Sequence, residues 1–502
     1  MAEAASDIAA PSRTFCPRQR RRFVLVAAIL ASSMGFIDGS VVSIATPAIR
    51  ATLPATLAEA LWISNAYMLF LSSLILIGGA AGDRYGLRRV FMIGICVFTV
   101  ASLCCAIATN AETLIVARAV QGIGAAIMVP GSLAIIAKAY PADERGKAIG
   151  IWAAASALTT AAGPILGGAA LSVLGDSAWR LLFAINLPFG AIALAMLWFL
   201  VPPDEATGRR RLDLVGGGLI TLALFVLAFG LTGGGGEGSV PGAGAVTLAI
   251  GLCAVLVVLF IWWERRCTAP MVPLTLFANR AFSGANMLTF TLYFGLSAML
   301  FYLPMTVIGG WGVTEAAASL MFVPITVMVG LFSGRAGDYA DRHGPAWPVT
   351  AGSLIVAMSY GVLALTVQTQ NYWLGVMPLM AISAFGMALL VSPLSTAVMT
   401  SVDDDDTGTA SGINNAVSRM AGLVTVAAMG LLAAALYPVL MGGGETSFGE
   451  IVENAAPSVA RAHADATTLT FAAIAGVTAV LSAVSAAIAW TTLPRSGKAD
   501  AG

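Results

Sequence analysis

The chain has 502 residues, of which 58% are hydrophobic and only 10% carry a charge. A soluble globular protein carries roughly 25% charged residues, so this composition excludes the soluble class and indicates a chain that resides in a lipid bilayer. The formal net charge of +0 argues against a nucleic-acid partner, because no basic surface is available to neutralise phosphates.

Runs of about 20 apolar residues, the length that crosses a hydrocarbon core as a helix, recur along the whole chain. An N-terminal secretory signal is rejected, because the first run is itself of spanning length. We predict fourteen spans, at residues 23–45, 57–79, 90–109, 113–137, 148–172, 181–201, 212–232, 243–263, 282–308, 314–334, 348–367, 376–400, 413–440 and 468–491.

The basic residues test this count, since cytoplasmic loops of membrane proteins are enriched in Lys and Arg. With both termini inside, 21 of the 26 basic residues are cytoplasmic, three are outside (Arg50, Arg180 and Arg461) and two lie within spans (Arg118 and Arg419). One missed helix would scatter these charges over both sides. The sequence therefore predicts an all-α membrane protein with fourteen transmembrane helices and both termini cytoplasmic.

A motif of the pattern G-x-x-x-D-R-x-G occurs twice, each time in a short cytoplasmic turn after a helix. The copies lie at residues 79–86 and 337–344. The chain is therefore predicted to contain two related halves, with a substrate site between them near the bilayer midplane, as in alternating-access transporters. If each half contains six helices, two of the fourteen predicted helices belong to neither half.

Residues 79–89 resemble the first loop signature of the major facilitator superfamily. Residues 118–124 resemble its second signature, and the segment with Gly163, Pro164, Gly167 and Gly168 resembles the motif associated with its exporters. Two further segments, 38–47 and 179–188, resemble the drug:proton antiporter branch with fourteen helices, which is the multidrug efflux type. In that branch helices seven and eight are an insertion between two six-helix halves.

The resemblance implies the major facilitator fold and a division of the chain into five parts. These are a cytoplasmic tail at 1–22, a six-helix bundle at 23–201, a linker with two extra helices at 202–266, a second six-helix bundle at 267–492 and a cytoplasmic tail at 493–502. The implied activity is proton-coupled antiport, which exports amphiphilic organic compounds or drugs by alternating access.

Asp38 and Arg118 are ionisable residues inside predicted spans, where a charge costs at least a few kcal/mol and marks a functional site by default. Their depths from the outer helix ends are roughly 11 and 8 Å at 1.5 Å per residue, so they can lie at one level. In the resembled fold the two helices adjoin, so protonation of Asp38 would free Arg118. We predict that Asp38 carries the coupled proton, or exchanges it with a cationic substrate, and that Arg118 sets the pKa of Asp38. The alternative is a static ion pair that joins two helices.

Charged residues of the cytoplasmic loops are predicted to form a gate, because the first loop motif has that role in the resembled superfamily. We expect an ion-pair latch that closes the inner face and breaks on reorientation, or, as the alternative, charges that only set the topology. Arg419 is expected to be structural, with its guanidinium snorkelling to the cytoplasmic interface. The gate residues are Asp83, Arg84, Gly86, Arg88, Arg89, Arg145, Asp341 and Arg342.

Aromatic side chains recur near helical spacing in the ninth span, where one face can stack planar or cationic substrates. Packing in the core or against lipid is the alternative for each of them. With a single deep acid, Asp38, a neutral or monocationic substrate fits better than a dication. The substrate-binding candidates are Trp62, Tyr67, Phe290, Tyr293, Phe294 and Phe301.

An ATP-driven pump is excluded, because none of the three lysines stands in a G-x-x-x-x-G-K-[ST] loop. An embedded enzyme is not favoured, since the two histidines, His343 and His463, fall in predicted loops on opposite sides and leave no metal cluster or triad in the bilayer. We expect no cofactor and no metal, with the proton gradient as the energy source.

The expected partners are an amphiphilic small molecule, protons and the lipid bilayer, with a monomer as the working expectation. Two other functions stay open: a proton symporter that imports a metabolite, and a non-transporting membrane sensor or scaffold. The Ala- and Gly-rich, Lys-poor composition is typical of a bacterium with a GC-rich genome. We therefore expect a multi-pass protein of the bacterial inner membrane.

Overall fold

The computed structural model describes residues 15–204, 212–233, 241–403, 406–443, 446–452 and 455–495. These residues form helices joined by short connections, and no strand occurs among them. Fourteen of the helical segments are long and apolar enough to cross a membrane. The all-α fold and the fourteen predicted spans are confirmed.

The first six spans and the two that follow them make up the amino-terminal part. They are α1 (Arg18–Thr52), α2 (Leu57–Tyr85), α3 (Leu87–Ala106), α4 (Ala111–Ala139), α5 (Ala142–Leu174), a sixth span of η1 (Asp176–Ala178), α6 (Trp179–Ala184) and α7 (Asn186–Phe199), then α8 (Leu214–Thr232) and α9 (Ala243–Glu264).

The last six spans follow a short 3-10 turn, η3 (Leu274–Ala278). They are α10 (Arg280–Met305) with η4 (Thr306–Gly310), then α11 (Glu315–Ser319) with η5 (Leu320–Phe322) and α12 (Val323–His343), then α13 (Ala346–Thr366) with η6 (Val367–Thr369), then η7 (Tyr372–Val376) with α14 (Met377–Thr400), then α15 (Thr407–Met441) and α16 (Pro457–Thr492).

Several helices continue beyond the predicted apolar runs. α15 begins at Thr407 rather than residue 413, and α16 begins at Pro457 rather than residue 468. Backbone hydrogen bonds continue a helix through polar residues, whereas hydropathy marks only the part inside hydrocarbon. Two expectations are corrected as a result: His463 lies within α16 instead of a loop, and Arg419 lies twelve residues after the start of α15.

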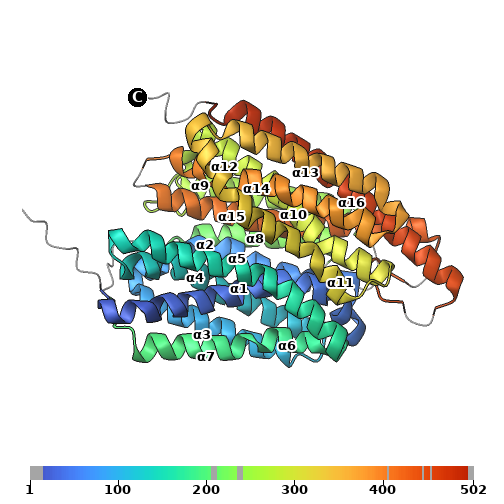
Figure 1. Ribbon diagram of the computed structural model, residues 1–502, viewed down its shortest axis with the longest axis horizontal. Helices are drawn as coiled ribbons and strands as arrows, with labels where there is room; N and C mark the ends of the chain where they lie inside the picture. The colour runs from blue at the N-terminus through green and yellow to red at the C-terminus, as the bar shows by residue number, and fades with distance from the viewer. Residues whose placement is uncertain are drawn as a thin grey trace, which may run out of the picture.

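The two halves lie side by side (Figure 1), with α1 to α7 in blue to green below and α10 to α16 in yellow to red above. The start of α1 and the end of α16 lie at the same, left-hand end of the molecule. The halves meet where α2 packs along α15, α1 against α10 and α5 against α11. The inserted helix α8 covers α2 and α15 at this junction, where the Trp62 and Phe225 ring centroids are 5.7 Å apart.

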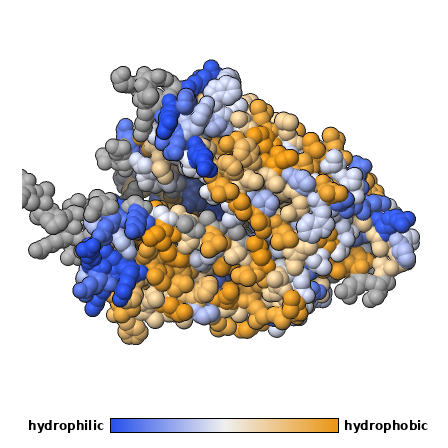
Figure 2. Space-filling view, in the orientation of Figure 1, coloured by the Kyte–Doolittle hydropathy of each residue, from blue (hydrophilic) through white to orange (hydrophobic). Residues whose placement is uncertain are grey.

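The junction is closed at the outer end and open at the cytoplasmic end. A Cβ atom on Gly168 of α5 would lie 2.4 Å from the Glu315 carbonyl oxygen of α11, whereas no atom lies within 4 Å of such a Cβ on Gly150 of α5 or Gly334 of α12. Figure 2 shows a hollow between the halves at the left-hand end, with hydrophilic side chains inside it. The molecule is therefore open towards the cytoplasm.

Glycine permits the close approach of α2 and α4. A Cβ on Gly78 would lie 2.1 Å from the Ala126 carbonyl oxygen, and one on Gly122 would lie 2.5 Å from the Tyr67 carbonyl oxygen. Small residues allow helix backbones to touch in membranes, where packing rather than hydrophobic exclusion drives helix association. This contact brings Arg118 of α4 up against α2.

Replacing Gly78 by Ala is expected to lower the stability of the protein, because the added methyl cannot fit beside the Ala126 backbone without separating the two helices. Overpacking of this kind costs about 1–3 kcal/mol. The measurement is thermal unfolding of the purified protein in detergent, together with its folded yield.

Gly79→Ala is the matched control. Its added Cβ would meet Pro130 at an ordinary 3.8 Å, so its unfolding temperature should equal or exceed that of the wild type. Equal unfolding temperatures for the two variants would contradict the packing role of Gly78.

Candidate functional site

A buried ion pair joins α1 to α4 in the amino-terminal half. Asp38 is 0% exposed and Arg118 is 1% exposed, and an Arg118 Nη1 hydrogen donates directly to Asp38 Oδ2. The Arg118 Nε group donates to the Ile63 carbonyl of α2 at 3.0 Å. The two residues that the sequence placed at one level are thus in direct contact.

Gln121, one turn along α4, connects the two charges. Its Oε1 atom accepts a hydrogen bond from Arg118 at 2.6 Å, and its Nε2 atom donates to Asp38 Oδ1 at 2.9 Å. The same Nε2 atom donates to the Ser102 hydroxyl of α3 at 2.9 Å. Sequence reasoning quoted Gln121 within a motif without assigning it a role, because its contact with Asp38 arises only from helix packing.

Aromatic rings enclose the guanidinium of Arg118. Its central carbon lies 4.3 Å from the ring centroid of Tyr67 and 5.6 Å from that of Phe183. A cation over a desolvated ring is stabilised by the ring quadrupole by about 2 kcal/mol or more. The rings of Tyr67 and Phe183 would therefore still stabilise the Arg118 guanidinium if Asp38 were protonated and neutral.

The exporter-like motif of α5 packs directly beside Asp38. A Cβ on Gly163 would lie 2.7 Å from the Ser40 hydroxyl, and one on Gly167 would lie 2.3 Å from a Val41 methyl. Pro164 lies within the same continuous helix. Gly168 contacts α11 of the other half. The same part of α5 therefore packs both against the residues next to Asp38 and against the closed outer end of the junction.

The outer closure depends on Arg50 at the end of α1, which is 6% exposed. Its guanidinium donates to the Phe448 carbonyl at 2.7 Å and to the Ser447 hydroxyl, and lies 4.0 Å from Glu450. The Ser447 amide in turn donates to the Glu450 carboxylate at 2.8 Å. The segment 446–452, which joins α15 to α16, is thus held on α1 of the other half.

His463 of α16 forms a hydrogen bond with the segment 446–452. The Tyr437 hydroxyl lies 2.5 Å from His463 Nδ1, and the Glu450 carbonyl lies 3.1 Å from Nε2. Since a carbonyl only accepts, Nε2 carries the hydrogen and Nδ1 accepts from Tyr437. Sequence reasoning missed Arg50 and His463 because it treated both as solvated outer residues.

At the cytoplasmic end, Asp204 organises the first loop motif. Its carboxylate accepts from the backbone amides of Leu87 and Arg88, both at 2.9 Å, and from Lys138 at 2.7 Å. Burial alone would raise the pKa of Asp204, but these hydrogen bonds, that from Lys138 foremost, outweigh burial and hold the pKa below its usual value. No local pattern in the sequence pointed to Asp204.

Among the gate residues whose side chains the structure describes, no ion-pair latch forms in this conformation. Arg88 donates to the Leu197 and Trp198 carbonyls at the end of α7, and Gly86 adopts a φ of 94° at the turn into α3. Within the described side chains, the ion pairs involve none of the following residues: Arg84, Arg88, Arg89, Arg145, Asp341 and Arg342. The Asp83 side chain lies outside the described residues.

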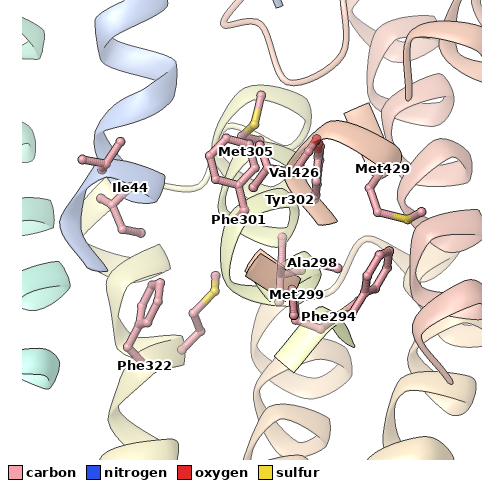
Figure 3. Packing of buried hydrophobic residues seen from close by; sticks show 14 of the residues in the cluster. Ile44, Phe294, Ala298, Met299, Phe301, Tyr302, Met305, Phe322, Val426 and Met429 are labelled. Atoms are coloured by element: carbon pink, nitrogen blue, oxygen red, sulfur yellow. The ribbon is translucent and has the colours of Figure 1, made fainter. Parts of the chain in front are cut away.

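The six aromatic candidates divide into four environments. Trp62 packs on α8, and Phe294 and Phe301 are buried in the apolar cluster between α10 and α15 (Figure 3), where the Tyr302 hydroxyl donates to the Val426 carbonyl. Phe290 and Tyr293 of α10 are partly exposed and pack against the same cluster, where the Phe290 and Phe294 ring centroids are 6.4 Å apart. Of the candidates, Tyr67 contacts the ion pair, and Phe290 and Tyr293 remain accessible.

Among the residues that the structure describes, no group of three His, Cys, Asp or Glu side chains lies close enough to hold a metal ion. The centre of the site is a buried carboxylate that is held by an arginine and a glutamine.

Replacing Arg50 by Ala is expected to release the segment 446–452 from α1. Its amide hydrogens should exchange with solvent about tenfold faster or more, because the loop loses two charge-assisted hydrogen bonds. Hydrogen–deuterium exchange followed by mass spectrometry measures this directly. Arg461→Ala is the control, since Arg461 is exposed at the same end. Unchanged exchange in Arg50→Ala would show that Arg50 does not hold the closure.

Comparison with known proteins gives a consistent result. The sequence model of the Major Facilitator Superfamily matches residues 28–426. The multidrug resistance protein Stp of Mycobacterium tuberculosis (strain CDC 1551 / Oshkosh) is 32% identical over 414 residues, which cover 82% of this chain and 75% of that protein. The methylenomycin A resistance protein of Streptomyces coelicolor (strain ATCC BAA-471 / A3(2) / M145) is 32% identical over 401 residues, or 80% and 83% of the two chains.

A solved structure shares the fold. The crystal structure of a bacterial homologue of the human lysosomal transporter Spinster, in an inward-facing and occupied conformation, superposes with a TM-score of 0.65 at 17% identity, over 95% of this chain and 98% of the other. These matches confirm the family that the motifs predicted. The chain belongs to the major facilitator superfamily and is a multi-pass membrane transporter, not an enzyme.

Proposed function

We propose that this protein exports amphiphilic organic compounds from the bacterial cytoplasm across the inner membrane, as a monomer, in exchange for protons and without a cofactor. The observation that carries this proposal is the Asp38–Arg118 pair, a carboxylate buried among helices with one compensating cation. Embedded acids mark proton pathways in transporters. The names of the relatives, which are resistance proteins, support the outward direction.

In the proposed cycle Asp38 alternates between two protonation states. The ionised carboxylate binds Arg118 and Gln121, which ties α1 to α4. Protonation removes the charge that Arg118 neutralises, so the link between α1 and α4 weakens. The guanidinium keeps its aromatic neighbours, the Ile63 carbonyl and Gln121 Oε1. A static pair is the less favourable explanation, because buried ion pairs seldom add stability over apolar packing.

The route from Asp38 to the outer closure is short. α5 touches α1 on both sides of Asp38 through Gly163 and Gly167, and it touches the other half through Gly168. A change in the position of α1 therefore displaces α5 at a place where it contacts α11. This contiguous packing is the physical link that alternating access requires between protonation and opening.

Replacing Asp38 by Asn is expected to abolish gradient-driven transport. Inverted membrane vesicles with an imposed proton gradient should accumulate an amphiphilic dye in the wild type and fall to background in the variant at equal protein level, because the amide cannot take up a proton. Asp465→Asn, an exposed acid at the outer end of α16, should transport normally.

Retained proton-dependent uptake in Asp38→Asn would refute the role of Asp38. Substrate accumulation by intact cells would favour the importing symporter, and absence of any flux in the wild type would favour a sensor or scaffold.

Replacing Gly168 by Ala is expected to reduce transport strongly, because its Cβ would lie 2.4 Å from the Glu315 carbonyl oxygen and 2.8 Å from Ser319 when the outer side closes. The same vesicle assay measures the rate. Gly150→Ala is the control in the same helix, since its Cβ meets no atom within 4 Å. Equal rates for the two variants would rule out Gly168 as a closure contact.

A further inference from the structure

Two acidic side chains meet at the cytoplasmic end of the inserted helix pair. Asp213 is the residue before α8, and Glu264 is the last residue of α9. Asp213 is 7% exposed and Glu264 is 4% exposed. Two carboxyl groups are therefore buried in a part of the molecule that the proposed export cycle does not use.

One oxygen of each carboxyl group has its hydrogen-bond donors. Asp213 Oδ1 accepts from the Gly216 backbone amide and from the Trp263 indole Nε1, both at 2.8 Å. Glu264 Oε2 accepts from the Val272 backbone amide at 3.2 Å. These bonds cap the start of α8, join α8 to α9 and hold the connection that leads from α9 towards the second half.

The other two oxygens lie together without a donor. A Cβ atom on Gly216 would lie 2.5 Å from Asp213 Oδ2 and 3.0 Å from Glu264 Oε1, so both oxygens lie beside the same point of the α8 backbone. Both atoms are buried, and no described group donates a hydrogen bond to either of them. An ionised carboxylate only accepts hydrogen bonds, whereas a protonated one also donates. Two ionised groups placed in this way would repel each other.

The surroundings leave this repulsion uncompensated. Among the described side chains, no cation forms an ion pair with either carboxyl group. Arg265 is exposed, and Arg266 lies over the Trp262 ring at 4.3 Å. The charged and titratable groups described on the flanking segment and on the nearer parts of the helices packed against α8 are Arg84, Tyr85, Arg265, Arg266, Cys267 and Arg419.

A proton fits this place better than a metal ion. Metal ions in proteins take four or more ligands, whereas two carboxyl oxygens are free here and the other two receive N–H donors. No group of three acidic, histidine or cysteine side chains within the described residues could hold a metal. A single proton between two carboxyl groups needs only the two free oxygens and removes the repulsion.

The two helix ends assign the proton to Glu264. The amino end of a helix carries a partial positive charge and the carboxyl end a partial negative charge. Asp213 lies at the amino end of α8 and receives two donors, which favours its ionised form. Glu264 lies at the carboxyl end of α9, which favours its neutral form. The neutral acid can donate from Oε1 to Asp213 Oδ2 while its Oε2 accepts from Val272.

We propose that Asp213 and Glu264 form a second proton-binding site, in which one proton bridges the two carboxyl groups and fastens α8 to α9. The proposal goes beyond the proposed function and does not depend on it. α8 packs on α2 of the first half and on α15 of the second, so the site lies where the inserted helices join both halves. Loss of the proton to cytoplasmic water leaves two buried anions and weakens this attachment.

The first test is infrared difference spectroscopy of the purified full chain in detergent, titrated from about pH 5 to about pH 9, above the ordinary glutamate pKa of about 4.3. The wild type is expected to lose a carbonyl band of a protonated carboxylic acid as the pH rises. Glu264→Gln should lack this band, because its amide donates to Asp213 in place of the acid. Asp213→Asn should lack it too, because the new amide donates to an ionised Glu264.

Glu112→Gln is the matched control, since it replaces an exposed glutamate at the start of α4, and it should keep the band. Identical band changes in the wild type and in Glu264→Gln would overturn the site. Asp38 is present in all of these proteins, so its own contribution cancels from the comparison.

Thermal unfolding over the same pH range is the second test. A proton that the folded state holds and the unfolded state releases makes stability fall as the pH rises. The unfolding temperature of the wild type should therefore fall more steeply than that of Glu264→Gln, whose amide cannot lose the bridging hydrogen. Equal slopes would contradict the proposal. An unfolding temperature that added Na⁺ or Ca²⁺ raises in the wild type but not in Glu264→Gln would replace the proton by a metal cation.

Discussion

The carboxylate of Asp38 is the constraint on which the arrangement of the amino-terminal half depends. A charge that is 0% exposed must be compensated within hydrogen-bond distance, since desolvating an isolated ion costs several kcal/mol. Compensation comes from Arg118, and Arg118 reaches Asp38 because glycines let α4 lie directly on α2. The Ile63 carbonyl and the Tyr67 ring, both on α2, then hold the guanidinium in place. The packing of α4 on α2 therefore also provides the compensation for the charge of Asp38.

Polar interactions at the two ends of the molecule have different partners, which explains why it is open on one side. At the outer end Arg50 binds a segment of the other half, so its interactions join the halves. At the cytoplasmic end Asp204 binds Lys138 and the start of α3, all within the same half. The amino-terminal half is thus internally reinforced towards the cytoplasm, and the described ion pair that crosses the junction lies at the outer end.

The sequence predicted the spans well because each needs about 20 apolar residues and the basic residues record the side of each loop. It also predicted that Asp38 and Arg118 lie at one level, since a regular helix converts residue number into depth. The sequence did not predict the contacts of Arg50, His463 and Asp204. Each of these residues binds a partner far away in the chain, and hydropathy assigns polar residues at helix ends to solvent whether or not a tertiary partner buries them.

Arg419 is another residue whose position the sequence did not predict correctly. Its depth depended on where α15 begins, and polar residues before the apolar run hid six helical residues. Once the helix is placed, the two embedded arginines belong to different halves, Arg118 to the first and Arg419 to the second. Tyr67 of α2 carries Arg118 on its ring face at 4.3 Å, and α2 packs along α15, the helix of Arg419. A movement of the second half that shifts α15 along α2 therefore acts on the helix that holds the guanidinium of Arg118.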